Sequence, residues 1–477
     1  MKNYLYDAVI IGSGPNGLAA AIYLAQRKLS VLVVEAADEI GGGTRSAQLT
    51  RPGFIHDVCS AIHPLTIASP FFQTLPLDDF GLEFVQPAAS VAHPLDDGTA
   101  VLLKKSVEET AANLGTDGTS YERLVKVLAR NFKVIAPDLL APFGIPSNPF
   151  LMLGFALKGL TSAKSLADHY FKETAARALF AGNAAHSMIP LEDNPSAAFG
   201  LVLLLTGHAV GWGFPKGGAN KIADALAAYF LSLGGKIETG REVENVDELP
   251  ASRVVLFDLT PRQIIKIAGH RLPDSYRKRL ATYKYGAGVF KMDFALSEPI
   301  PWKAKECFEA GTVHVGGRFE EIAASERAHA EGKISDKPFV LVAQNSLFDS
   351  TRAPEGHHTG WAYCHVPNGS TADMSEIIEN QIERFAPGFR DCILAKSVKT
   401  PADLEKQNAN YIGGDINGGA GTLSQLFTRP VAKLNPYAIP SKGLYICSAS
   451  TPPGGGVHGM CGYHAAKTAF KREFGRG

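Results

Sequence analysis

The chain has 477 residues, 45% of them hydrophobic, so it is long enough for several domains and can fill large cores. Lys and Arg together number 47, as do Asp and Glu, and the formal net charge is zero. This balance gives no electrostatic reason to expect nucleic acid or another strongly charged partner.

The first predicted unit, residues 9–35, has the order strand, glycine turn, helix, strand. Gly12, Gly14 and Gly17 are spaced G-x-G-x-x-G, and Glu35 ends the second strand. Gly12 permits the tight turn, Gly14 lets a pyrophosphate approach the backbone, and Gly17 lets helix and strand pack closely. The helix N-terminus offers free N–H groups to phosphates, and Glu35 can accept hydrogen bonds from ribose hydroxyls. The unit therefore predicts dinucleotide binding.

A second glycine turn follows at residues 41–46, giving the spacing E-x5-G-G-x-x-R-S from Glu35. This pattern resembles the flavoprotein superfamily that holds amine oxidases, carotenoid desaturases and Rab GDP-dissociation inhibitors. The resemblance implies that Gly42 and Gly43 run beside the pyrophosphate and ribityl chain of FAD, with the charge of Arg45 nearby. A solvated surface turn is the alternative interpretation.

The next part of the chain is predicted to be helical. Apolar residues recur near every 3.6 positions in residues 121–134, 150–160 and 168–181. Residues 194–215 carry no charged side chain, but their proline and glycines argue against a bilayer-spanning helix and favour a buried one over the cofactor cavity. The apolar stretch 150–157 is suited to docking on a membrane surface, with ordinary core packing as the alternative.

Two inner blocks resemble the return of the chain to the FAD domain in these families. Residues 212–218 match a W-x-x-P-x-G-G pattern, and a helix is expected over 219–233. Residues 236–243 match the strand whose valine, here Val243, usually contacts adenine through its backbone.

A third block and a later strand pair follow. Residues 254–261 resemble an apolar strand that ends in N-x-(T/D)-P, with Asp258 in place of the asparagine. The chain between positions 246 and 254 is too short for the β-hairpin that relatives usually carry. Residues 339–343 and 360–365 read as strands of an antiparallel sheet over the flavin.

The C-terminal end repeats the order strand, glycine loop, helix at residues 443–450, 451–457 and 458–470. It closely resembles the bacterial-type phytoene desaturase family. A helix N-terminus here can stabilise negative charge at flavin N1 and O2. Ser448 and Ser450 stand where many flavoprotein relatives carry an acidic residue, so cofactor contacts in this segment are expected to be mostly through the backbone.

Residues 53–64 and 413–430 also resemble one subgroup of the family. That subgroup holds carotenoid isomerases, retinol saturases and the pyridine nucleotide-disulphide oxidoreductase domain-containing proteins. The resemblance implies an α/β fold in which a Rossmann-like FAD domain of three layers (ββα) is interleaved with an α+β substrate domain. The expected FAD domain comprises residues 1–65, 213–285 and 405–477, and the substrate domain comprises a helical insertion, 66–212, and a sheet-forming one, 286–404.

The expected cofactor is FAD. The residues expected to contact it are Gly12, Ser13, Gly14, Pro15, Asn16, Gly17, Glu35, Ala36, Gly42, Gly43, Thr44, Arg45, Val243, Ser448, Gly456, Val457, His458 and Met460.

Catalysis of desaturation requires hydride transfer to flavin N5 and loss of a proton from the neighbouring carbon. His63 and His458 are the best candidates for handling that proton, because each lies in a motif expected near the flavin ring. His208, Tyr463 and Asp57 come next, and a structural or capping role is the alternative for each.

No metal site is predicted. His314, His357 and His358 lack metal-ligand spacing, and the six cysteines are scattered without a CxxC pair. The glycine-rich stretch 413–419 does not lie between a strand and a helix, so the chain has a single dinucleotide motif. It is expected to oxidise its substrate with flavin, or to use flavin without net turnover of electrons.

Three functions are compatible with these patterns. The first is an FAD-dependent oxidoreductase of the phytoene desaturase type that acts on a small apolar substrate, isoprenoid or lipid-like, by desaturation, saturation or isomerisation. The second is a flavin amine oxidase, for which Trp361 and Tyr363 could form the aromatic pair. The third is a non-enzymatic binding protein similar to the GDP-dissociation inhibitors.

The chain enters its first strand almost at once, which leaves no room for a cleavable signal. A cytoplasmic location is therefore expected, with peripheral membrane association as an addition, and the oligomeric state is left open.

Overall fold

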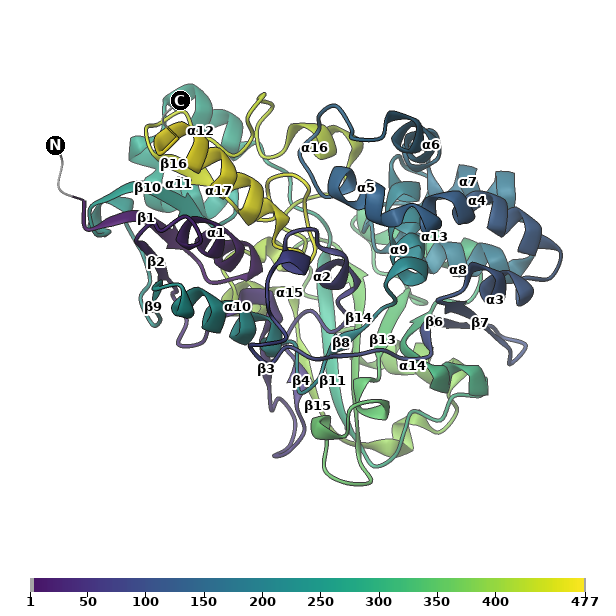
Figure 1. Ribbon diagram of the computed structural model, residues 1–477. Helices are drawn as coiled ribbons and strands as arrows, with labels where there is room; N and C mark the ends of the chain where they lie inside the picture. The colour runs from purple at the N-terminus through teal and green to yellow at the C-terminus, as the bar shows by residue number, and fades with distance from the viewer. Residues whose placement is uncertain (1–3, 476–477) are drawn as a thin grey trace.

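The computed structural model describes residues 4–475. Its first sheet has five parallel strands in the order β16-β10-β1-β2-β9. N-terminal, central and C-terminal segments meet in this sheet (Figure 1), and the predicted Rossmann-like architecture is confirmed. The strands are β1 (Tyr6–Ile11), β2 (Val31–Val34), β9 (Lys236–Glu238), β10 (Ser252–Phe257) and β16 (Leu444–Ile446).

Helices cover both faces of the parallel sheet, whose strands are apolar runs because both faces are buried. One face packs against α1 (Pro15–Ala25), α10 (Asn220–Ser232) and α17 (Met460–Glu473), and the other against α11 (Pro261–Ala268) and α12 (Asp274–Ala281). The expected ββα order therefore needs one correction. The outer layer is built from α11, α12 and the short 3-10 helix η4 (Val246–Glu248) instead of strands.

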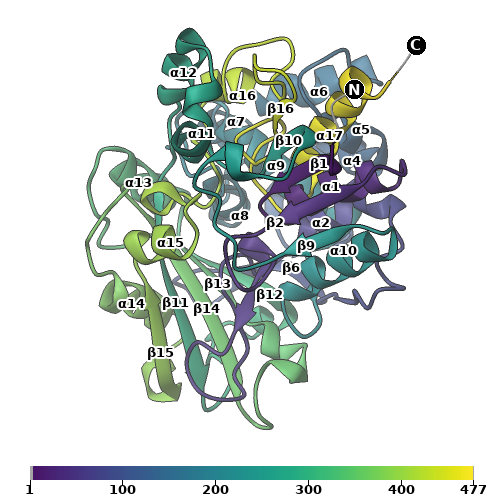
Figure 2. The same cartoon turned by 90° about the vertical axis from the view of Figure 1, so that its left-hand side faces the viewer.

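The second sheet is mixed and has seven strands in the order β15-β11-β14-β13-β12-β6-β7. All neighbours are antiparallel except β12 and β6. Figure 2 shows its long strands below the parallel sheet. The strands are β6 (Ala89–Pro94), β7 (Ala100–Lys104), β11 (Gly288–Leu296), β12 (Ala310–Val315), β13 (Val340–Ala343), β14 (His358–Val366) and β15 (Ile393–Lys399).

The predicted strands at 339–343 and 360–365 are confirmed as β13 and β14. However, β6 and β7 lie in the first insertion, which was predicted to be helical throughout. One face of this sheet packs against α14 (Ser375–Phe385). The other face packs against α13 (Phe319–Ala330) and the helical insertion.

The helices of the first insertion form a layer beside the mixed sheet (Figure 1). The predicted helix 121–134 is divided at Asn131, and the predicted helix 168–181 is wrong as one element, because the chain is not helical between Tyr170 and Thr174. The helices are α3 (Val107–Ala112), α4 (Gly118–Arg130), α5 (Phe132–Leu139), α6 (Pro149–Gly159), α7 (Ala163–Tyr170), α8 (Thr174–Ala185) and α9 (Ser196–Ala209).

The uncharged segment 194–215 forms α9, which contributes its Leu201, Leu204 and Leu205 to the largest core. None of the helices among the described residues combines the length and hydropathy needed to cross a bilayer. The prediction of a buried helix in this segment is confirmed by its contacts in the core, and its place over the cofactor cavity stays a prediction.

Short elements connect the two sheets. They are the pairs β3 (Ser46–Ala47) with β4 (His56–Asp57) and β5 (Phe84–Val85) with β8 (Phe214–Pro215), and the helices α2 (Pro64–Ala68), α15 (Pro401–Gln407) and α16 (Leu423–Thr428). All parallel strands lie in the segments predicted for the FAD domain, and all strands of the mixed sheet lie in the other two. The exact boundaries stay a prediction.

Candidate functional site

The glycine turn between β1 and α1 is too tight for side chains. Gly12 has φ 100°, and a Cβ added to Gly17 would lie 2.1 Å from the Gly12 carbonyl oxygen. A Cβ on Gly14 would lie 2.8 Å from Oδ2 of Asp258, which follows β10. The turn therefore exposes backbone, with α1 beginning directly beyond it, as a phosphate-binding turn requires.

Glu35 lies at the end of β2, at the edge of this turn, and is nearly buried. Its Oε2 accepts hydrogen bonds from the Ser13 backbone N–H at 2.9 Å and the Ser13 hydroxyl at 2.6 Å. Its Oε1 accepts from the Ala37 N–H at 3.0 Å and lies 3.4 Å from Arg45. Glu35 is thus fixed in place, and Arg45 is directed toward it.

The second glycine turn packs directly on the first. The Gly41 N–H donates to the Ser13 carbonyl at 3.1 Å. Gly42 has φ 55°, and its added Cβ would lie 3.3 Å from Gly14 Cα. The two turns therefore form one continuous stretch of exposed backbone.

The C-terminal glycine loop and the helix after it lie beside the same two glycine turns. A Cβ on Gly462 of α17 would lie 1.8 Å from the Asn16 carbonyl oxygen, so α17 crosses α1 in backbone contact. Thr66 donates its hydroxyl to the Val457 carbonyl at 2.6 Å, and Ser69 donates to that of His458 at 2.7 Å. The C-terminal glycine segment thus converges with two glycine turns that lie hundreds of residues before it in the sequence.

Comparison with known proteins agrees with this geometry. A family described as "DAO: FAD dependent oxidoreductase" matches residues 7–267, which is more than half of the chain. The chain belongs to this family. Its cofactor is FAD, and it is an FAD-dependent oxidoreductase, so the interpretation as a non-enzymatic binding protein is set aside.

Relatives and solved structures extend the likeness over the full chain. The rat protein named pyridine nucleotide-disulfide oxidoreductase domain-containing protein 2 is 26% identical over 98% of this chain and 93% of its own. A phytoene desaturase (neurosporene-forming) of Rhodobacter capsulatus is 24% identical over 95% of this chain and 92% of its own. A putrescine oxidase solved with putrescine has a TM-score of 0.62 at 16% identity, covering 97% of this chain and 98% of its own, which shows a shared fold.

Asp258 contacts the glycine turn between β1 and α1. From the sequence it stood out only because relatives carry asparagine at this position, and no contact with the turn was predicted. Its Oδ2 accepts a hydrogen bond from the Gly17 N–H at 2.9 Å, at the start of α1. Burial raises the pKa of Asp258 to about 7, the Gly17 N–H opposes this, and the charge of Glu35 adds to it. The carboxyl group therefore titrates beside the glycine turn near neutral pH.

We expect the affinity for FAD to fall as pH rises through 7. A pyrophosphate on the glycine turn would raise the pKa of Asp258 further, so the cofactor would bind with uptake of a proton, tightest below 7. The affinity for FAD would fall by at most about tenfold per pH unit. Fluorescence titration of apoprotein with FAD at pH 6 and pH 8 measures it. The Asp258→Asn variant should bind FAD with the same affinity at pH 6 and pH 8. An equally steep loss of affinity in that variant would contradict the assignment of the pH dependence to Asp258.

His63 lies just before α2, and its ring is buried. Its backbone N–H donates to the Gly213 carbonyl at 3.0 Å, and its Nε2 lies 3.0 Å from the Ser60 hydroxyl. Burial lowers the pKa of His63 to about 4. His63 is therefore neutral near pH 7, and its Nδ1 has no hydrogen-bond partner among the described residues.

His458 precedes α17 and is fully buried. Its Nδ1 accepts the Met460 backbone N–H at 3.0 Å, so it caps the helix. Burial lowers the pKa of His458 to about 4, and its Nε2 is unpaired within residues 4–475. The capping role, foreseen as an alternative, is present, whereas the catalytic role stays a prediction.

Other predicted residues have structural contacts. Ser448 donates its hydroxyl to the Leu259 carbonyl at 2.7 Å, and Val243 is buried beneath the parallel sheet. The strand expected over 236–243 ends earlier, at Glu238. His208 lies 2.6 Å from the hydroxyl of Tyr121, which makes it part of the helical core.

A buried ionic cluster escaped the sequence analysis. Arg352 is 1% exposed and pairs with Asp57 at 2.9 Å and Asp349 at 3.2 Å. Burial alone would raise the pKa of Asp57, but the Arg352 guanidinium and several hydrogen bonds hold it below its ordinary value. Asp57 thus anchors the segment after the second glycine turn to the mixed sheet.

A second buried pair lies close by on β11. Lys291 bonds to Asp293, and the Lys291 Nζ lies 5.6 Å from the Trp361 ring centroid. Burial raises the pKa of Asp293 to about 6, although Lys291 opposes this shift. Trp361 and Tyr363 of β14 contact each other edge to face, with centroids 5.0 Å apart.

A histidine–carboxylate cluster lies farther along β14. Glu326 of α13 is fully buried and bonds to His365 Nδ1 at 2.9 Å and to His329 Nε2 at 3.1 Å. Burial would raise the pKa of Glu326, but the two histidines lower it to about 2. The three ligand-type atoms lie within 4.8 Å of one another, a grouping that sequence spacing did not reveal. We interpret it as a hydrogen-bond network that fixes α13 to β14, and the absence of a metal stays a prediction.

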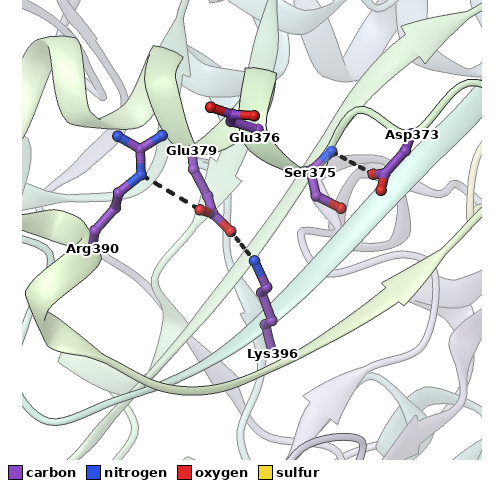
Figure 3. A pocket seen from close by; sticks show the side chains of 6 residues that line it. All are labelled: Asp373, Ser375, Glu376, Glu379, Arg390 and Lys396. Atoms are coloured by element: carbon purple, nitrogen blue, oxygen red, sulfur yellow. Dashed lines mark hydrogen bonds and ion pairs between the residues drawn. The ribbon is translucent and has the colours of Figure 1, made fainter.

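A surface hollow lies on the far side of the mixed sheet (Figure 3). Glu379 pairs there with Lys396 at 2.6 Å and with Arg390 at 3.5 Å. Its walls are polar side chains of α14, β15 and the turns beside them, far from the glycine turns. These paired charges are typical of a solvated surface and do not form part of the cofactor site.

Proposed function

We propose that this flavoprotein transfers hydride between flavin N5 and a C–C bond of an apolar, isoprenoid or lipid-like substrate, by desaturation, saturation or isomerisation. Bound FAD supplies the two-electron acceptor. The names of its relatives, phytoene desaturase among them, support this substrate class. Peripheral membrane contact is part of the proposal, because substrates of this class partition into lipid.

The observation that carries the proposal is a set of partly covered apolar side chains on the helical core, one of which lies beside the second glycine turn. Tyr411 lies beside the second glycine turn, where its hydroxyl would be 2.5 Å from a Cβ on Gly43. Tyr411 and apolar side chains of two other chain segments pack against the same helical core without being fully covered. They include Ile62, Trp361, Tyr411 and Ile416. Such a partly covered apolar layer beside a cofactor suits an apolar substrate.

The converging glycine turns are proposed to hold FAD. The turn from Gly12 to Gly17 would receive the pyrophosphate, and Glu35 would accept hydrogen bonds from the ribose. Residues 42–45 would follow the ribityl chain, and residues 456–460 would meet the flavin ring. The fit is supported by the missing side chains, since a Cβ at Gly14 or Gly42 would narrow the backbone surface that a dinucleotide must approach.

His63 and His458 are proposed to act near the flavin ring as neutral hydrogen-bonding groups. Burial keeps both unprotonated at neutral pH, so neither supplies fixed charge. The segments that carry them are adjacent, because Thr66 of α2 bonds to Val457.

The Nδ1 of His458 accepts the Met460 N–H, so its neutral ring carries the proton on Nε2, which can donate a hydrogen bond. The Ser60 hydroxyl donates to the Gly43 carbonyl, so His63 donates to it from Nε2 and keeps Nδ1 as an acceptor.

A flavin amine oxidase is the second candidate function. The perpendicular contact of Trp361 with Tyr363 on the substrate-facing sheet favours it, as does the fold shared with putrescine oxidase. Against it, the carboxylate near this pair, Asp293, is already bonded to Lys291, so it is not free to bind a protonated amine.

Anaerobic reduction of the flavin tests the proposal. The purified holoenzyme is mixed with phytoene and limonene in detergent, and separately with putrescine and cyclohexylamine, while the visible flavin band is followed. We expect an apolar compound to bleach the band and the amines to leave it unchanged. Bleaching by an amine alone would replace this proposal with the amine oxidase.

A further inference from the structure

Exposed large apolar side chains gather on one face of the helical insertion. Phe143, Ile145 and Phe150 are 85%, 96% and 87% exposed. Phe150 is on α6, and Phe143 and Ile145 are in the loop that joins α5 to α6. These two helices lie with α16 in the upper part of both views (Figures 1 and 2). We call this surface the apolar face; it comprises Val127, Val134, Phe143, Ile145, Phe150, Leu153, Leu157, Leu160 and Phe427.

Specific contacts hold the segments of the apolar face in place. Phe143, in the loop before α6, contacts Phe427 of α16 with ring centroids 5.3 Å apart at 88°, so two distant segments meet there. Asn148 caps α6 by accepting the Leu151 N–H at 3.1 Å, and Lys158 donates to the Leu124 carbonyl at 3.1 Å. These contacts hold the helix against the core.

The helix α6 is apolar on nearly all sides, yet its own buried residues are only Phe155 and Gly159. A helix of this composition is normally covered on all sides. Leu153 and Leu157 are more than half exposed on its outer side. Contiguous exposed apolar surface of this kind marks an interaction site.

Charge indicates what covers this face. The sequence has no acidic residue in 139–167 and none in 416–472, the segments that contribute α6 and α16, although the second carries six Lys and Arg. Lys133 of α5 and Lys433 after α16 are exposed.

The helices α4 and α5 add two acidic residues, but Glu122 is paired with Lys126 and Asp138 accepts a hydrogen bond from the Ser147 hydroxyl. An apolar surface with basic side chains beside it that form no ion pair within residues 4–475 complements anionic lipid headgroups over an acyl layer. Two copies of this chain would instead bring like charges together.

We propose that the apolar face docks on an anionic phospholipid membrane, with α6 and the loop before it entering the lipid interface. This rests on the peripheral membrane contact of the proposed function and deepens it by naming the surface and the lipid charge; it does not depend on which substrate is oxidised. The face lies on the helical insertion, which also packs over the substrate-facing side of the mixed sheet. A substrate dissolved in the membrane would then have a short path to the enzyme.

Vesicle flotation of the holoenzyme tests the docking. We expect it to float with vesicles of phosphatidylcholine and phosphatidylglycerol. The triple variant Phe150→Ser, Leu153→Ser, Leu157→Ser should lose at least about tenfold in vesicle affinity. The matched control Leu231→Ser, Phe308→Ser removes exposed apolar groups elsewhere and should bind like wild type. An unchanged flavin spectrum shows that each variant is folded. Wild-type protein that stays unbound, or a triple variant that floats equally, would overturn the proposal.

A charge variant tests the lipid preference. Lys133→Gln, Lys433→Gln should weaken binding to the anionic vesicles by about tenfold, and high salt should do the same. Light scattering of the wild type and the triple variant tests whether a second copy of the chain covers the apolar face instead. A dimer that the triple variant abolishes, without vesicle binding by the wild type, would assign the face to self-association. Flavin reduction in detergent should be equal in all variants, which separates this test from that of the oxidoreductase function.

Discussion

Replacing Gly17 with alanine is expected to leave the purified protein with less than about a tenth of the wild-type FAD. The new Cβ would lie 2.1 Å from the Gly12 carbonyl oxygen. Because that atom is backbone, the start of α1 must move away from β1. The turn would then lose its close approach to the pyrophosphate. The flavin-to-protein absorbance ratio after purification measures the loss.

Gly154→Ala is the matched control. Gly154 also lies in a helix, α6, but none of the described heavy atoms lies within 4 Å of the position of its Cβ. Alanine there should keep full FAD content and stabilise the helix by about 0.5–1 kcal/mol. Normal FAD content in Gly17→Ala would show that the turn tolerates a side chain and does not hold the pyrophosphate.

Arg352→Met is expected to lower the free energy of unfolding by about 3–5 kcal/mol. Arg352 is 1% exposed, and its loss would leave the buried carboxylates of Asp57 and Asp349 without their cation. Those carboxylates must then take up protons or admit water, and the link between the second glycine turn and the mixed sheet weakens. Thermal unfolding at pH 7, followed by circular dichroism, reports the change.

Arg277→Met provides the comparison. Arg277 pairs with Asp274 at 2.8 Å on the surface of α12, with both side chains exposed. A surface pair of this kind contributes only about 0–1 kcal/mol. If the two variants unfold at the same temperature, the buried cluster does not anchor the sheets.

The parallel sheet could be predicted because its signals are local. The β1 strand, the glycine turn, α1 and Glu35 occupy one short stretch of sequence, and each residue type is required by the backbone at its position. The C-terminal loop was found through its glycines and its resemblance to a family. That these segments touch, as Gly462 does Asn16, follows only from the fold.

The hairpin of β6 and β7 was missed although a signal was present. Asp97-Gly98 lies between two apolar runs, and the turn is closed by the Leu95 N–H to Thr99 carbonyl bond at 2.8 Å. Asp-Gly in this setting is a strong hairpin signal. The helical periodicity of the following segments dominated the interpretation of the whole insertion.

The ionic cluster could not have been predicted from spacing. Asp57 and Arg352 are 295 positions apart, and neither stands in a pattern that names its partner. The same holds for Glu326 and His365, which come from a helix and a strand. Long-range pairs of this kind depend on how the sheets are stacked, which composition and periodicity do not encode.

The central claim is that two N-terminal glycine turns and the distant C-terminal glycine loop form one FAD site. Acid release of the chromophore from the purified full-length protein, with identification and quantification of the flavin, tests it most directly. The account predicts one FAD per chain and flavin bands in the visible spectrum. A colourless protein that takes up no added FAD would contradict it.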